Sequence, residues 1–133
     1  MVNLSTIGIW ILRLLAAVIL LQTLYFKFSA APESIYIFSK IGMEPWGRIT
    51  TGIFELIAGI LILIPATTAY GASLAIALMA GAIFFHLTKL GISVQNDGGQ
   101  LFIYALLVFA SSTVLAVIYR NDLLTAKKLF LKS

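Results

Sequence analysis

An acidic residue lies in the middle of one of the most apolar stretches of this chain. The stretch GIFELIAGILILIP, residues 52–65, suits a membrane-crossing helix, yet it contains Glu55. A charged side chain near the centre of a span costs roughly 2.5–3.5 kcal/mol on insertion scales, so such residues face a bundle interior or a cavity and find partners. Gly52 and Gly59 share a helical face with Glu55, which favours close approach of a neighbouring helix or a ligand. Glu55 is therefore our first candidate for ligand binding or proton exchange.

Arg13 is the expected partner of Glu55. From the rise of a helix, Arg13 lies roughly 9 Å and Glu55 roughly 14 Å from the same end of their predicted helices. A long arginine side chain can bridge that difference. The pair then has two interpretations: a proton-exchange site in which Arg13 tunes the carboxylate, or a structural ion pair that only fixes the helix register, because buried pairs often serve specificity more than stability.

A second group of polar residues is expected at the opposite end of the spans. Lys27 lies on the helical stripe of Arg13 but roughly 21 Å further along, and Arg48 opens the next apolar segment. In FFHLTKLG, His86 and Lys89 share a face. These residues predict a basic rim that binds a polar head group or, through His86, exchanges a proton near neutral pH. Basic residues at helix ends also extend toward lipid phosphates, an alternative that applies above all to Lys89 and Arg48.

Four predicted transmembrane helices position these residues. The chain has 133 residues, of which 61% are hydrophobic and only 11% charged, whereas soluble domains are about 25% charged. Segments close to the roughly 20 apolar residues that a span requires are residues 7–28, 45–64, 69–90 and 101–119. Because the tight turn PATT makes the second and third helices antiparallel, the sequence predicts one all-α domain, an integral membrane four-helix antiparallel bundle.

The remaining segments are predicted to lie at the membrane surface. In the connection 29–44, PESIYIFSKIG is amphipathic and suits a short interfacial helix, and the basic amphipathic tail 120–133 suits a position on the membrane. A slight excess of lysine and arginine on the side of the termini predicts that both termini are cytoplasmic. We also expect Ala77 and Gly81, in a stripe of small residues, to lie at a helix contact.

Composition excludes several kinds of chemistry. The chain has no cysteine and one histidine, which excludes disulfides and thiolate metal sites and predicts that no metal is held. We find no phosphate loop, nucleotide fingerprint, paired haem histidines, flavin motif or serine nucleophile elbow, so we assign no catalytic residue. The net charge is +4, but the basic residues flank apolar segments, so we expect membrane lipid and no nucleic acid as a partner.

Four motifs, taken in order, resemble the DoxX-like family of small four-span bacterial membrane proteins. They are LRLL…FKF, GIFELIAGILILIP, FFHL and GGQLFIYALL, one for each predicted span. The family's basic residue late in the first helix is matched by Lys27. Its glutamate with a small-residue patch in the second helix is matched by Glu55 and Gly59, and its late histidine in the third by His86. The family's usual glycine before the lysine is missing from LQTLYFKF.

The resemblance implies a bacterial inner (cytoplasmic) membrane protein, and some relatives are membrane subunits of thiosulfate:quinone oxidoreductase. By that analogy we expect a redox-associated subunit that binds a quinone or similar lipid-like molecule inside the bundle. Glu55 would exchange a proton, Arg13 would tune it, and His86 with Lys27 would orient a carbonyl oxygen. The chain would then be an accessory subunit of a redox partner protein rather than a stand-alone enzyme. A small proton-coupled transporter, a lipid-binding protein, a purely structural or assembly subunit and a homo-oligomer stay open.

Overall fold

The protein, described here from a computed structural model over residues 4–125, is built from helices alone in that range. The long helices are α1 (Leu4–Phe28), α3 (Trp46–Leu63), α4 (Thr68–Phe85) and α5 (Gln100–Ile118), and the shorter elements are α2 (Pro32–Lys40), the 3₁₀ turn η1 (Pro65–Thr67) and the π-helical turn η2 (His86–Leu90). Residues 120–125 are also helical. Among the described residues, four segments are long and apolar enough to cross a membrane: Ser5–Phe28, Trp46–Leu63, Pro65–Leu90 and Gln100–Ile118. The predicted all-α membrane bundle is confirmed.

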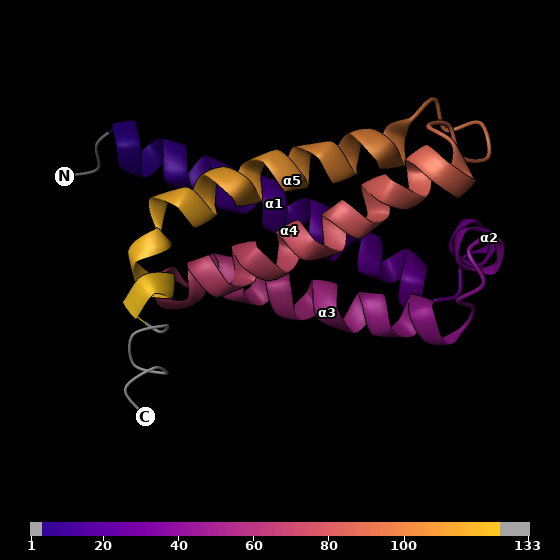
Figure 1. Cartoon of the computed structure of the whole chain (residues 1–133), viewed down its shortest axis with the longest axis horizontal. Coiled ribbons are helices and arrows are strands. Elements are labelled where there is room, and N and C mark those ends of the chain that lie inside the picture. The colour runs from indigo at the N-terminus through magenta and orange to yellow at the C-terminus, as the bar shows by residue number, and fades with distance from the viewer. Residues whose placement is uncertain (1–3, 126–133) are drawn as a thin grey trace.

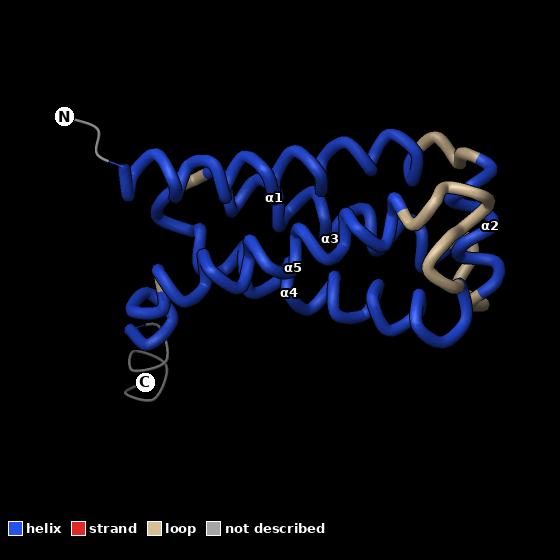
Figure 2. The backbone as a smooth tube through the Cα atoms, turned by 90° about the horizontal axis from the view of Figure 1, so that it is seen from above, coloured by secondary structure: helices blue, strands red, loops and turns tan. Residues whose placement is uncertain are grey.

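The four long helices alternate in direction and form a ring. Helix α1 packs against α3 and α5, and α4 closes the ring by packing against the same two helices. Figure 1 shows the two ends of the described chain at one end of the bundle, which we call the terminal end. Helix α2 and the longer loops gather at the opposite end, the loop end, as Figure 2 shows from above.

Two glycines allow α3 to approach α1 closely. A Cβ atom on Gly52 would lie 2.7 Å from Cε1 of Phe28, and one on Gly59 would lie 2.9 Å from Cδ2 of Leu21. The glycines on the face of Glu55 therefore do admit a neighbouring helix. These two contacts also set the register, because they place Phe28 opposite Gly52 and Leu21 opposite Gly59.

The bundle is closely packed from its middle toward the terminal end. A Cβ on Gly71 of α4 would lie 2.7 Å from the backbone nitrogen of Ile62 and 2.8 Å from the carbonyl oxygen of Ala58, both on α3. Small and branched side chains fill the space between the helices. The almost completely buried ones are Ala16, Ala17, Leu20, Ala58, Ile62, Ala72, Ala75, Val108 and Leu115.

The expected helix contact at Ala77 and Gly81 is wrong. Both residues line a cavity at the loop end, and a Cβ on Gly81 would have no atom within 4 Å. The face of α4 that packs passes through Gly71 and Ala75. Ala77 lies two residues beyond Ala75, which is roughly 200° around the helix. The small residues at the helix contact are therefore those on the face of Gly71 and Ala75, not those on the face of Ala77.

Candidate functional site

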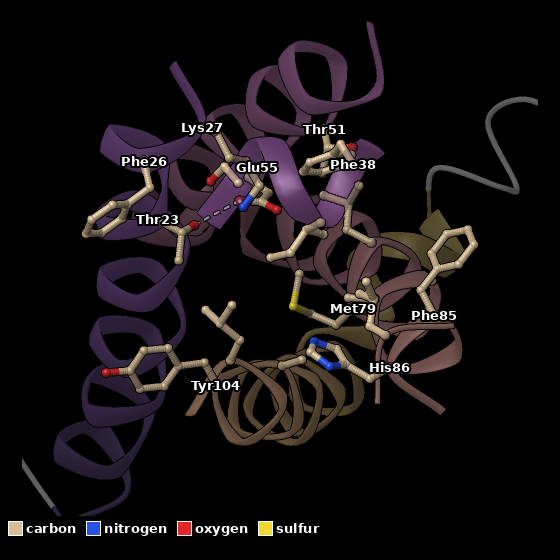
Figure 3. A pocket seen from close by; sticks show the side chains of 18 of the residues that line it. Thr23, Phe26, Lys27, Phe38, Thr51, Glu55, Met79, Phe85, His86 and Tyr104 are labelled. Carbon is tan, nitrogen blue, oxygen red and sulfur yellow. Dashed lines mark hydrogen bonds and ion pairs between the residues drawn. The ribbon is translucent and has the colours of Figure 1, made fainter. Parts of the chain in front are cut away.

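A cavity of about 430 Å³ lies at the loop end, where all four long helices and α2 contribute to its walls. Most of its lining is apolar. Figure 3 shows polar side chains entering it from different helices, with Thr23, Lys27 and Glu55 on one wall and His86 and Tyr104 on others. Three of the five predicted site residues, Lys27, Glu55 and His86, thus share one cavity at the end opposite the termini.

Glu55 is held by two residues of α1. Its Oε2 lies 3.2 Å from Nζ of Lys27 and accepts a hydrogen bond from Oγ1 of Thr23 at 3.0 Å. Thr23 and Lys27 are one helical turn apart, so α1 presents both to the same carboxylate. Glu55 is only 3% exposed, yet its Oε1 has no hydrogen-bond partner within residues 4–125 and is not sealed from the cavity. This oxygen is available to a ligand or a proton.

The expected pairing of Glu55 with Arg13 is wrong. Arg13 lies ten residues before Thr23 on α1, roughly 15 Å along the axis. The prediction aligned the helices by their ends, whereas the Leu21–Gly59 contact aligns them by packing. Measured along the helix axes from that contact, Arg13 lies roughly 12 Å toward the terminal end. In the same direction α3 ends after roughly 6 Å. Arg13 therefore lies beyond the end of α3.

Arg13 instead occupies an aromatic site between α1 and the end of α5. Its Nη2 donates to the hydroxyl of Tyr119, and its Cζ lies 4.7 Å from the ring centroid of Trp10 and 5.1 Å from that of Tyr119. The residue is 2% exposed. It does not line the loop-end cavity, so a role in tuning Glu55 has no geometric support.

Arg48 stands behind the cavity rather than in its wall. Its Nε donates to both carboxylate oxygens of Glu44, at 2.9 and 3.0 Å, and its Nη1 donates to the carbonyl oxygen of Lys27. Arg48 is buried, so it does not extend to lipid in the way an exposed helix-end arginine would. By binding a carbonyl in the last turn of α1, it fixes the backbone that carries Lys27.

His86 enters the cavity from the first position of the π-helical turn η2. Such turns are frequent at functional sites. Its Nδ1 lies 2.9 Å from the carbonyl oxygen of Gly91, and because a carbonyl can only accept, Nδ1 carries the hydrogen of that bond. The ring also packs edge-on against Phe102, with centroids 5.5 Å apart. Nε2 makes no hydrogen bond with any described residue, so it is an acceptor in the neutral ring and a donor in the charged one.

The loop behind His86 is held by a single carboxylate. Asp97 Oδ1 accepts the backbone N–H groups of Val94 at 3.0 Å and Gly99 at 2.8 Å, and Oδ2 accepts that of Leu101 at 3.2 Å. Burial raises the pKa of Asp97, but these three hydrogen bonds and the nearby charge of His86 outweigh it and hold the pKa below its usual range. Asp97 thereby joins the turn after η2 to the start of α5.

Sequence reasoning missed three contributions to the site. Thr23 was readable from its spacing, since it lies four residues before Lys27 on the same helical face. Tyr104 accepts a hydrogen bond from Nε2 of Gln100 at 2.9 Å, and this i, i+4 pair was also visible in the sequence. The third contribution is α2, which adds Ser34 and Phe38 to the lining. No sequence pattern gave its position above the cavity.

One protein-family model matches the part of the chain that contains the predicted cavity residues. The family model described as DoxX matches residues 8–88, which is more than half of the chain. The matched range includes Lys27, Glu55 and His86. No curated protein matches the chain, and no solved structure matches it.

Proposed function

Because the chain belongs to the DoxX family of membrane proteins, we propose that it is a redox-associated membrane subunit that binds a quinone or a similar lipid-like molecule in the loop-end cavity. The observation that carries the proposal is the cavity itself. Small-molecule sites are concave, mostly apolar and furnished with few polar groups. This cavity adds a buried carboxylate, an ammonium group and an imidazole to apolar walls.

The polar groups suit a ligand that has an apolar body and carbonyl oxygens. Nζ of Lys27 and, when protonated, Nε2 of His86 can donate to such oxygens from different walls. Glu55 can supply or accept a proton through Oε1, because Thr23 and Lys27 both bind Oε2. Reduction of a quinone to its quinol takes up protons together with electrons. In this proposal Glu55 and His86 exchange the protons, and a redox partner protein supplies the electrons.

The location is part of the same proposal. We place the chain in the bacterial inner membrane with both termini in the cytoplasm, which the slight excess of basic residues at the terminal end supports. The loop-end cavity then faces the outer side of that membrane. Its ligand would enter from the lipid or from that surface, close to α2.

Ligand binding can be tested with a pair of substitutions in one turn. His86→Ala removes a cavity group, whereas Lys89→Ala removes an exposed basic residue of the same π-helical turn that does not line the cavity. We expect His86→Ala to weaken binding of a decyl-substituted benzoquinone about fivefold, the worth of one net hydrogen bond, and Lys89→Ala to leave it unchanged. Isothermal titration calorimetry in detergent measures both.

The proton role needs its own variant. Glu55→Gln keeps the shape of the side chain but cannot exchange a proton, so we expect it to retain the benzoquinone while losing redox activity in membranes that contain the partner. No quinone in lipid extracts of gently purified protein, together with no binding of the benzoquinone, would overturn the proposal.

A small proton-coupled transporter is the alternative function that one observation favours. The last turn of the third span, η2, is π-helical and begins at His86, and irregular helical segments border many transport sites. However, the buried core around Ala17, Ala58 and Ala72 fills the bundle toward the terminal end. Transport would require that core to open. Proton-coupled flux in proteoliposomes containing only this protein would favour the transporter.

A further inference from the structure

Arg13 carries a buried positive charge that has no counter-charge among the described residues. Arginine stays protonated in proteins, and a buried charge is normally paired. Within residues 4–125, however, the only hydrogen bond of the Arg13 side chain goes to the neutral hydroxyl of Tyr119. The buried Nε has no partner there, and no carboxylate there lies within ion-pair distance. Stacking on Trp10 and Tyr119 reduces the cost of this burial but does not neutralise the charge.

None of the acidic side chains of this chain forms an ion pair with Arg13. The sequence has five acidic residues, and residues 1–3 and 126–133 contribute none of them. Glu55 pairs with Lys27, Glu44 pairs with Arg48, and Asp97 binds backbone amides. Of the other two, Glu33 lines the loop-end cavity, and Asp122 forms no ion pair within residues 4–125. The counter-charge of Arg13 must therefore come from outside the acidic side chains of this chain.

The surroundings of Arg13 are apolar, aromatic and close to a membrane surface. Arg13 lies beyond the last residue of α3, and Trp10, which covers one face of its guanidinium, is 39% exposed. Beside it a shallow groove runs between the start of α1 and the end of α5. The groove is lined by Ser5, Gly8, Ile9, Leu12 and Ile118. Interfacial tryptophan and tyrosine are typical of the head-group level of a bilayer.

We propose that Arg13 and this groove bind an anionic phospholipid. Nη1 of the guanidinium has no hydrogen-bond partner within residues 4–125 and, unlike Nε, is not sealed from the surface. It donates to a phosphate oxygen, which supplies the missing counter-charge, and planar guanidinium donors suit phosphate well. An acyl chain lies in the apolar groove, where a Cβ on Gly8 would meet no atom within 4 Å. A free phosphate ion would satisfy the charge but would leave the groove unused, so the lipid is the better fit. This site is separate from the loop-end cavity and does not depend on the proposed quinone.

The experiment uses quenching of Trp10 fluorescence to report which lipid lies beside Arg13. The chain has two tryptophans, so Trp46→Phe leaves Trp10 alone. The protein is reconstituted in vesicles of equal parts phosphatidylcholine and phosphatidylglycerol, with bromine on the acyl chains of one lipid at a time. We expect brominated phosphatidylglycerol to quench Trp10 more strongly, with a local enrichment of about fivefold, the attraction of one basic residue to anionic lipid. Added inorganic phosphate should not remove this preference.

Two variants assign the preference to Arg13. Arg13→Gln should abolish it, and Arg13→Lys, which keeps the charge but not the planar donors, should keep part of it. Arg120→Gln is the matched control, because Arg120 is an exposed arginine at the same end, and it should keep the full preference. If Arg13→Gln does not fold, as circular dichroism would show, the lipid comparison in the Trp46→Phe background and Arg13→Lys still decides the question.

Three outcomes would overturn the proposal. Equal quenching by the two lipids in the Trp46→Phe protein is the first, and an unchanged preference in folded Arg13→Gln is the second. The third is displacement by inorganic phosphate, which would identify a free anion as the counter-charge. If equal quenching came with dimeric particles that become monomeric in Arg13→Gln, the counter-charge would belong to a second copy of the chain.

Discussion

Glu55 and Arg13 are buried charges in different apolar spans, and they are satisfied in opposite ways. Glu55, at the loop end, has a partner from its own chain in Lys27 and still presents one oxygen to a cavity. Arg13, toward the terminal end, is enclosed by aromatic rings and has no acidic partner within the described residues. The hollow end therefore carries a complete ion pair, whereas the packed end carries an incomplete one. A charge inside a span indicates a site, but only the packing around it tells whether the chain itself completes that site.

The largest effect should come from breaking the complete pair. Lys27→Ala leaves Glu55 buried without its cation, and removing one partner of a buried pair typically costs about 3–5 kcal/mol. We expect a large drop in the melting temperature in neutral detergent. Arg13→Gln in the same detergent should cost much less, because it removes a charge whose counter-charge that detergent does not supply.

The double variant Lys27→Leu with Glu55→Leu is the control for this comparison. It removes both charges together, so it should recover most of the stability that Lys27→Ala loses. If Lys27→Ala and Arg13→Gln melt at the same temperature, the contrast between the two buried charges is wrong. Functional assays on the double variant then separate the roles, because a proton-exchange site would be lost while the fold remains.

The packed and hollow regions can also be compared with one substitution at two places on α4. Gly71→Ala puts a Cβ against the backbone of α3, and overpacking of this kind costs about 1–3 kcal/mol. Gly81→Ala puts the same atom into open space and should stabilise the helix by up to about 1 kcal/mol. Melting temperatures should shift in opposite directions. Shifts of the same sign would mean that the two regions do not differ in packing.

The sequence predicts the helices that carry these two charges, but it does not predict the register between the helices. The spans and the family follow from apolar length and motif order, because hydrocarbon requires long, internally bonded helices. The cavity residues Lys27 and His86 follow from helical spacing and from counting which end of a span each occupies. The partner of Glu55 does not follow, since it depends on how far α1 slides past α3. The contacts of Gly52 and Gly59 decide that, and spacing within one helix carries no information about it.

The register between helices also explains why the sequence did not predict the position of Ala77 or the aromatic site around Arg13. A helix with small residues on two faces has two candidate contact faces, and only the packing of Gly71 against α3 decides between them. Likewise, Tyr119 is far from Arg13 in sequence, so their contact depends on the register of α5 against α1. Within one helical turn the sequence was informative, as Thr23 and Lys27 illustrate. Between helices it was not.

The smallest predicted effect concerns the loop that holds His86 at the hollow end. Asp97→Ala removes three hydrogen bonds to backbone amides and should cost about 1 kcal/mol, as lost helix caps do. The folded-state pKa of Asp97 lies below its usual value. Its stabilising contribution is therefore present above the pKa of the unfolded chain, about 4, and is lost as the pH falls through the folded-state pKa.

The pH dependence of the melting temperature tests whether the Asp97 carboxylate stabilises the loop in its ionised form. The difference in melting temperature between the wild type and Asp97→Ala should be constant near neutral pH and should shrink below about pH 4. Asp97→Asn retains one acceptor oxygen, so it should lose less than Asp97→Ala. If the difference grew on acidification, the carboxylate would be more stabilising in its protonated form, and its role as an ionised cap would be wrong. If benzoquinone binding weakened in Asp97→Ala with Lys89→Ala unaffected, the loop would also position His86 for the cavity.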